Sequence, residues 1–266
     1  MKAILSGLAL VVMGMLAGLL GLLFVRGAGS LSVGFLLDMP SRAGREGGIL
    51  PVLLSTGLLA GLALAVATPV GVATATYLQE YARPGPLVDL MRTLTGALAG
   101  VPSIVFGLFG FSLFVIRLGW GWSLASGGAT LALMLLPTLI RTTEEALAGV
   151  PSDLREGAAA LGAARWEAML RVILPAAAPG IMAGAILALG RALGETAAVL
   201  LTAGSDPSLP RSLGDPGRSL AIHLYLLVTE GQADGRAYAT ALVLVGGVLI
   251  VNLAANLTME RWRQGR

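Results

Sequence analysis

The chain has 266 residues, of which 56% are hydrophobic and 12% are charged, and its formal net charge is +3. Soluble domains carry about 25% charged residues, so this composition predicts an integral membrane protein. The small net charge and the scattered basic residues argue against a nucleic-acid partner. The sequence has no cysteine and one histidine, His223, which excludes disulfides, cysteine–metal sites and zinc sites of the His-Glu-x-x-His type.

The sequence contains a single lysine, Lys2. A P-loop needs its own lysine beside the nucleotide phosphates, and none is available here. We therefore expect the chain to bind no ATP, and we predict no cofactor, metal or catalytic site in it.

Crossing the hydrocarbon core takes about 20 apolar helical residues. Six stretches meet this condition: Ile4–Val25, Val52–Tyr77, Leu94–Ile116, Ser123–Ile140, Ala176–Ala203 and Ala237–Met259. The sequence thus predicts an all-α, polytopic fold with six transmembrane helices. We interpret the first stretch as a retained anchor, because its apolar run is longer than that of a cleaved signal peptide and no clear small-x-small site follows it.

The positive-inside rule favours a cytoplasmic location for both termini. In that orientation ten basic residues lie inside and seven lie outside. The inner set is Lys2, Arg83, Arg92, Arg141, Arg155, Arg165, Arg171, Arg261, Arg263 and Arg266. The outer set is Arg26, Arg42, Arg45, Arg117, Arg211, Arg218 and Arg236.

Two long connections, residues 26–51 and 204–236, are rich in glycine, proline and serine and are predicted to be outer loops. Within the second, Ser219–Thr229 is apolar but too short to cross, so we expect it at the membrane interface, with His223 in a structural role. Residues 117–122 are predicted to form a tight turn whose two tryptophans, Trp120 and Trp122, anchor it at the interface.

Residues 150–175 are predicted to form a cytoplasmic helix–turn–helix. Ser152 or Asp153 is expected to cap its first helix, with Asp153 and Glu156 forming a pair of the capping-box kind. The apolar side chains that recur at helical spacing on one face are Leu154, Ala158 and Leu161. Gly162 is expected to end this helix in the left-handed conformation.

A second short helix is predicted from Ala164 to Ile173, and Leu174-Pro175 is expected to stop it and to return the chain to the membrane. One interpretation of the whole segment is an amphipathic helix presented to a soluble partner. The alternative is a solvated helix that lies on the lipid headgroups.

The spacing Glu156-x5-Gly162-x9-Val172-x-Leu174-Pro175 resembles the EAA loop of binding-protein-dependent ABC importer permeases. Gly157 and Val172 are mild departures from that pattern. The resemblance implies the type-1 fold of these importers, in which residues 153–161 form a coupling helix that docks into a cytoplasmic ATPase. The coupling residues that it implies are Asp153, Leu154, Glu156, Ala158, Leu161 and Gly162.

Three further segments, Ile140–Leu147, Arg191–Ala197 and Leu200–Gly204, are similar to phosphate importer permeases of the PstA type. This resemblance implies import of inorganic phosphate together with three kinds of partner: a homologous permease subunit of the PstC type, two cytoplasmic ATP-binding subunits and an extracytoplasmic phosphate-binding protein. Sulfate and molybdate permeases share the Arg-x-x-Gly-Glu pattern, so another oxyanion is the alternative substrate.

The resemblance also implies an organisation along the chain. Residues 1–50 would hold the first helix and an outer loop, residues 51–256 the transmembrane domain with its coupling loop at 150–175, and residues 257–266 a cytoplasmic tail. The protein would reside in the cytoplasmic membrane.

Arg191 and Glu195 are the charged residues of the fifth stretch, and their spacing of four predicts that they share one face of one helix. Each ionised side chain at mid-membrane costs about 2.5–3.5 kcal/mol, which something must offset. Either they form a neutralising pair, or Arg191 meets the transported anion and Glu195 holds Arg191 between transport events.

Arg141, at the inner end of the fourth stretch, is the second candidate for the pathway, and an interfacial anchor is an equally good interpretation. The neighbouring Glu144 and Glu145 are predicted to lie on a solvated helix face.

Overall fold

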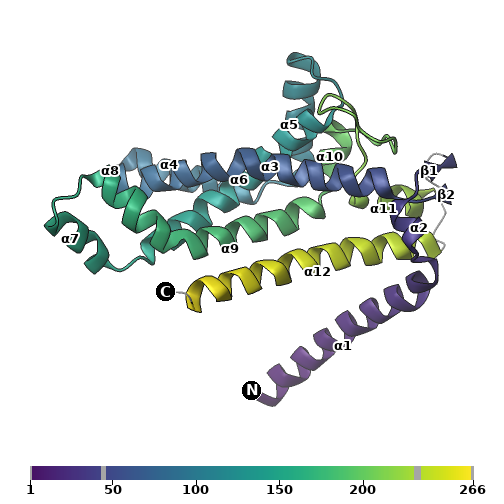
Figure 1. Ribbon diagram of the computed structural model, residues 1–266, viewed down its shortest axis with the longest axis horizontal. Helices are drawn as coiled ribbons and strands as arrows, with labels where there is room; N and C mark the ends of the chain where they lie inside the picture. Colours follow the sequence, from purple (N-terminus) through teal and green to yellow (C-terminus); the bar gives the residue numbers. More distant parts are fainter. Residues whose placement is uncertain (1, 43–45, 231–234, 265–266) are drawn as a thin grey trace.

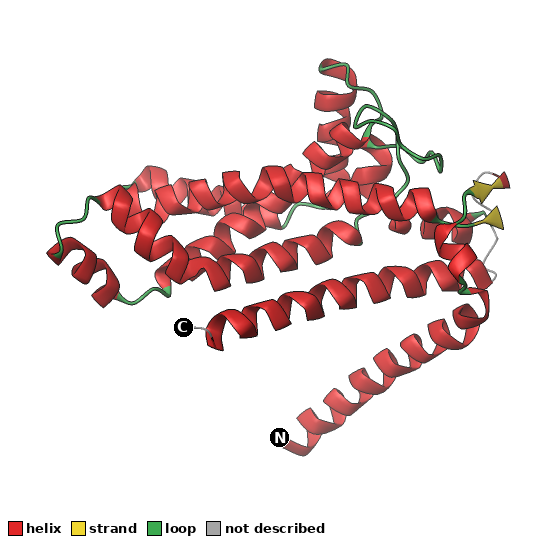
Figure 2. Cartoon of the chain, in the orientation of Figure 1, coloured by secondary structure: helices red, strands yellow, loops and turns green. Residues whose placement is uncertain are grey.

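The computed structural model describes residues 2–42, 46–230 and 235–264, and most of this part of the chain is helical (Figure 2). The helices form an elongated bundle, with α7 and α8 at one end and β1, β2 and α11 at the other (Figure 1). Arg45 and Arg266, two of the arginines counted for the orientation, lie outside the described residues.

In the part of the chain that the structure describes, five long helices build the bundle: α1 (Lys2–Gly27), α3 (Leu50–Thr76), α6 (Leu124–Ala148), α9 (Leu174–Leu193) and α12 (Gly235–Gln264). The shorter helices among the described residues are α2 (Val33–Leu37), α4 (Pro86–Ala99), α5 (Ser103–Gly110), α7 (Ser152–Ala160), α8 (Arg165–Ala168), α10 (Ala197–Thr202) and α11 (Leu220–Thr229). A 3₁₀ turn, η1 (Ala28–Ser30), follows α1, and three π-helical segments are η3 (Tyr77–Tyr81), η4 (Phe111–Arg117) and η5 (Met169–Ile173). Two short strands, β1 (Pro40–Ser41) and β2 (Glu46–Gly47), pair antiparallel.

Within the described residues, five helices are long and apolar enough to span a membrane, and the bent pair of α4 with α5 and η4 makes the sixth predicted crossing if it counts as one span. The third predicted span, Leu94–Ile116, is therefore not one continuous helix, because the chain bends by 102° between α4 and the helical segment formed by α5 and η4. The bend follows from Gly100-Val101-Pro102: proline has no backbone N–H to continue α4, and its ring disfavours helical geometry at the preceding residue.

The fifth predicted span, Ala176–Ala203, is also broken, so the prediction of one continuous helix was wrong. The helix α9 ends at Leu193 with Gly194 as its cap, and the short α10 begins at Ala197. As a result Arg191 lies in the last turn of α9, whereas Glu195 lies in the non-helical link between the two helices.

The main core lies where α3, α6, α9 and α10 meet, around Leu59, Leu131, Leu135, Leu139 and Val199. Glycines allow close approach here, as is common where helices pack in lipid. A Cβ on Gly71 of α3 would stand 3.0 Å from Cβ of Leu139 in α6, and a Cβ on Gly184 of α9 would collide with Thr142 in α6.

The helix α1 stands at the edge of the bundle beside α12 (Figure 1), and most side chains of its apolar stretch that the structure describes are exposed. Contact with α12 is concentrated near the end of α1, where Arg26 Nη1 donates to the Tyr238 hydroxyl at 2.9 Å. Both chain ends point toward the end of the bundle that carries α7 (Figure 1). This arrangement is what an even number of crossings requires.

Candidate coupling and anion-pathway sites

The segment between α6 and α9 protrudes from one end of the bundle as a helix–turn–helix (Figure 1). Gly162 has φ +77, so the prediction of a left-handed residue after α7 is confirmed. The predicted cap is wrong: Pro151 occupies the N-cap position, without a side-chain hydrogen bond, and Ser152 and Asp153 lie in the first turn. The capping interaction of this segment lies instead at α8, where Glu167 Oε2 accepts from the Ala164 N–H at 3.1 Å.

The stop predicted at Leu174-Pro175 is also wrong. The chain runs from α8 through η5 directly into α9, and Pro175 lies in the first turn of α9. The wider π-helical turn accommodates a residue that lacks a backbone N–H.

The predicted coupling residues divide into two groups. Asp153, Leu154, Glu156, Leu161 and Gly162 are exposed, and Leu161 reaches 90% exposure. Ala158, by contrast, is 7% exposed, so it faces the protein and packs the helix onto the rest of the chain. Trp166 of α8 is 57% exposed, so large apolar side chains of this segment lie on the surface of the chain.

Sequence reasoning missed the residue that ties α7 to the bundle, Arg155. Its Nη1 donates to the Val150 carbonyl at 2.7 Å, and its Nη2 donates to the Leu147 carbonyl at 2.8 Å and to Glu80 Oε1 at 2.7 Å. Glu80 lies in η3, 75 residues earlier in the chain. No local signal links the two residues, although Glu80 stands out as an acid directly after a predicted span.

The structure does not bring Arg191 and Glu195 together as an ion pair in the part of the chain that it describes. Glu195 Oε1 instead accepts from the Ala198 N–H at 3.4 Å, in the first turn of α10. The Arg191 side chain is exposed at the end of α9. An arginine in the last turn of a helix is favoured by the partial negative charge of the carbonyl groups there.

Arg141 is exposed on α6 and lies 3.6 Å from Glu145 Oε1, with both side chains 69% exposed. The prediction of a solvated helix face is confirmed for Glu145 and wrong for Glu144, which is 17% exposed and accepts from Arg92 Nε at 3.0 Å. Since Arg92 also donates to Gln79 Oε1 at 3.1 Å, one guanidinium joins α4, α6 and η3.

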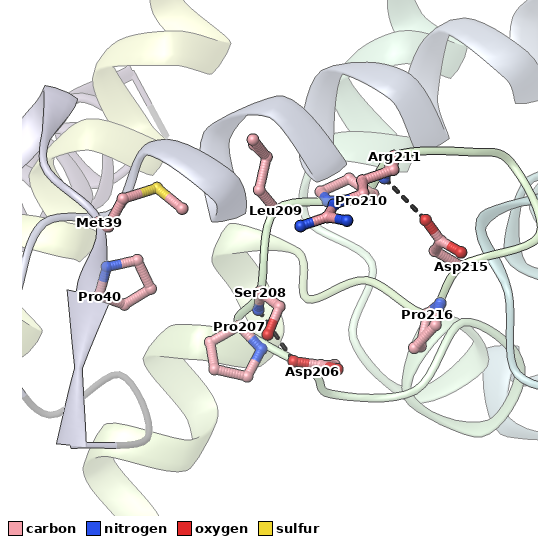
Figure 3. A pocket seen from close by; sticks show the side chains of 10 residues that line it. All are labelled: Met39, Pro40, Asp206, Pro207, Ser208, Leu209, Pro210, Arg211, Asp215 and Pro216. Atoms are coloured by element: carbon pink, nitrogen blue, oxygen red, sulfur yellow. Dashed lines mark hydrogen bonds between the residues drawn. The ribbon is translucent and has the colours of Figure 1, made fainter.

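At the opposite end of the bundle lies a pocket of about 580 Å³, lined by Met39, Pro40 and residues of the loop 206–216 (Figure 3). Asp206 and Asp215 shape the loop that lines it: Asp206 accepts from the Ser208 N–H, and Asp215 accepts from the N–H groups of Arg211 and Ser212. Those backbone donors lower the pKa of Asp215. The pocket carries both charge signs, so it shows no preference for anions by itself.

The short helix α11 packs beside this loop, and the structural role expected for His223 agrees with its burial at 2% exposure. Arg218 Nε donates to the Ser205 carbonyl at 2.7 Å, and its Nη1 lies 3.4 Å from His223 Nδ1. Burial, and then the charge of Arg218, lower the pKa of His223 to about 4. The predicted turn at 117–122 is also present, with Trp120 stacked on Phe114.

Comparison with known proteins gives a consistent result. The family described as "Binding-protein-dependent transport system inner membrane component" matches residues 67–264. The chain is 35% identical to the probable ABC transporter permease protein YqgI of Bacillus subtilis, over 93% of this chain and 90% of that protein. It is 34% identical to the phosphate transport system permease protein PstA of Haemophilus influenzae, over 90% of this chain and 85% of that protein.

Solved structures resemble the chain in fold. A chain of the MetNI methionine ABC transporter, in an inward-facing conformation, superposes with a TM-score of 0.63 at 20% identity, over 81% of this chain and 94% of that one. A chain of a bacterial ABC transporter involved in the import of alginate gives a TM-score of 0.65 at 16% identity, over 83% of this chain and 80% of that one.

Proposed function

The chain belongs to the family of binding-protein-dependent transport system inner membrane components, and we propose that it is the permease subunit of an ATP-driven importer of inorganic phosphate. It is a transport subunit of an ABC importer, and separate subunits hydrolyse the ATP. The observation that carries the substrate assignment is the identity of 34% to 38% with phosphate permeases named PstA, over 79% to 90% of this chain.

The proposed assembly pairs this chain with a homologous permease subunit of the PstC type, two cytoplasmic ATPases and an extracytoplasmic phosphate-binding protein. An ATPase would bind residues 153–161, and in this scheme α7 and both chain termini would lie in the cytoplasm. The binding protein would deliver phosphate at the end of the bundle that carries β1, β2 and the loop 204–219. Movement of the ATPases would then switch the helices between inward and outward opening.

Arg191 is the side chain that we propose meets the anion. Its guanidinium stays charged and offers a planar fork of donors that suits phosphate oxygens. Its exposure and its place at the break between α9 and α10 support this role, because the cost of a charge at membrane depth is reduced where water can reach it. Glu195 would act indirectly, by holding the first turn of α10 beside the pathway. Arg141 is a second proposed contact, nearer the cytoplasmic end.

The test is uptake of radioactive phosphate by the complete complex in proteoliposomes. Arg191→Gln is expected to lower the rate of phosphate uptake by about tenfold or more. Arg191→Lys keeps the charge but loses the planar fork of donors, so its uptake rate is expected to lie between those of the wild type and Arg191→Gln. Arg117→Gln, which removes an exposed charge from η4, is the matched control. Wild-type uptake by Arg191→Gln would end the assignment of this residue, and a wild-type complex that moves sulfate or molybdate in preference to phosphate would end the substrate assignment.

A further inference from the structure

Arg155 lies at a junction of three structural elements. Its guanidinium reaches the last turn of α6 through the Leu147 carbonyl, the following turn through the Val150 carbonyl, and the end of α3 through Glu80 in η3. The donor–acceptor distances are between 2.7 and 2.8 Å. The side chains of Arg155 and Glu80 are 29% and 16% exposed, so this pair is largely shielded from water.

Apolar packing contributes little between α7 and the end of α3. A cavity of about 220 Å³ lies between η3 and the coupling segment, and small side chains, Ala159, Ala163 and Ala168, line part of its wall. Within the described residues, α7 buries only Ala158 and packs most closely on α8 and η5. The direct link from α7 to α3 and α6 therefore depends on hydrogen bonds and charge.

The arrangement needs an arginine. The carbonyl of Leu147 lies in the last turn of α6, where it accepts from the Val150 N–H at 3.2 Å and from Arg155, and a cation near a helix carboxyl terminus is favourable. Only a guanidinium has enough fixed donors to satisfy two carbonyls and a carboxylate at once, whereas a lysine ammonium is a point charge on a flexible stem.

We infer that Arg155 and Glu80 form a strut that makes α3 and α6 move together with the coupling segment. The inference rests on the proposed function, because it takes α7 to be the part that the ATPase moves. Arg155 and Glu80 are positioning residues, and neither touches the anion in this scheme. Without the strut, the remaining polar contacts of the coupling segment with η3 are those of Arg165, whose Nη2 donates to the Glu80 carbonyl at 3.4 Å and whose guanidinium lies over the Tyr81 ring, so less of the movement of α7 reaches α3.

The deciding variant is Glu80→Ala in the complete complex. It removes both the charge and the acceptor oxygen of the pair but leaves Arg155 bonded to Leu147 and Val150, so the complex is expected to assemble. Basal ATP hydrolysis should stay near the wild-type rate, while phosphate moved per ATP, and the stimulation of ATP hydrolysis by the loaded binding protein, should each fall by about tenfold. Arg155→Gln should give the same phenotype, and Arg83→Gln, an exposed cytoplasmic-end arginine, should behave as wild type.

A covalent replacement of the strut provides the positive test. The native chain has no cysteine, so Glu80→Cys with Arg155→Cys introduces a unique pair. Joining these thiols with a bifunctional reagent about as long as the two lost side chains should restore transport per ATP relative to the unlinked double variant. A purely structural role would give no such rescue.

The two proposals fail separately. The strut is overturned if Glu80→Ala shows normal phosphate transport per ATP and normal stimulation by the binding protein. It is also overturned if the double cysteine variant stays uncoupled after linking. A wild-type complex that imports no phosphate overturns the substrate assignment alone, since stimulation by the binding protein still reports on the strut.

Discussion

Replacing Gly184 with alanine should force α6 and α9 apart. The new Cβ would stand 2.7 Å from Cβ of Thr142 and closer still to the Thr142 hydroxyl oxygen. That hydroxyl donates to the Thr138 carbonyl at 2.9 Å, so rotating it away costs a hydrogen bond. Overpacking of this kind costs about 1–3 kcal/mol. Alanine is also more favourable than glycine in a helix interior by up to about 1 kcal/mol, and this gain partly offsets the packing cost of Gly184→Ala.

Gly190 of the same helix isolates the packing cost, because a Cβ there would meet nothing within 4 Å. Gly190→Ala should gain the helix-propensity term alone. Subtracting the unfolding free energies of the two variants cancels the helix-propensity gain that they share. The remaining difference should be about 1–3 kcal/mol, with Gly184→Ala the less stable. Reversible unfolding in mixed detergent micelles, followed by circular dichroism, measures it. Equal stabilities would show that α6 and α9 do not approach as described.

Two further predictions concern pH and the coupling segment. The pKa of His223 is lowered from 6.5 to about 4 in the folded chain, so the unfolded chain binds the proton more readily. The contribution of neutral His223 to the free energy of unfolding is therefore fully present above pH 6.5 and falls by about 3 kcal/mol as the pH drops toward 4. Unfolding free energies of the wild type and of His223→Gln, measured as a function of pH, check this. Parallel pH profiles of the two proteins would contradict it. Gly162→Ala places a side chain at φ +77 and should cost about 1–2 kcal/mol, whereas Gly157→Ala inside α7 has open space and should gain up to about 1 kcal/mol. Proteolysis rates at residues 150–175 report both changes, and equal rates would remove the basis for the left-handed turn.

Local composition identifies much of this fold. Runs of about 20 apolar residues locate the membrane crossings because the hydrocarbon core has a fixed thickness and tolerates little charge. The same reasoning predicts that the charged segment 150–175 lies in water, and Gly162 marks its turn because glycine takes the left-handed conformation at little cost. These properties belong to single segments, so no knowledge of their neighbours is needed.

Only the tertiary structure decides how the charges are used. Glu195 follows Arg191 by four residues, but the break after Leu193 sends its carboxylate to α10. Arg155 finds its partner 75 residues away in Glu80, because the end of α3 packs beside the end of α6. Ion pairing depends on distances between side chains, and those distances are set by helix packing and helix breaks that spacing along the sequence does not reveal.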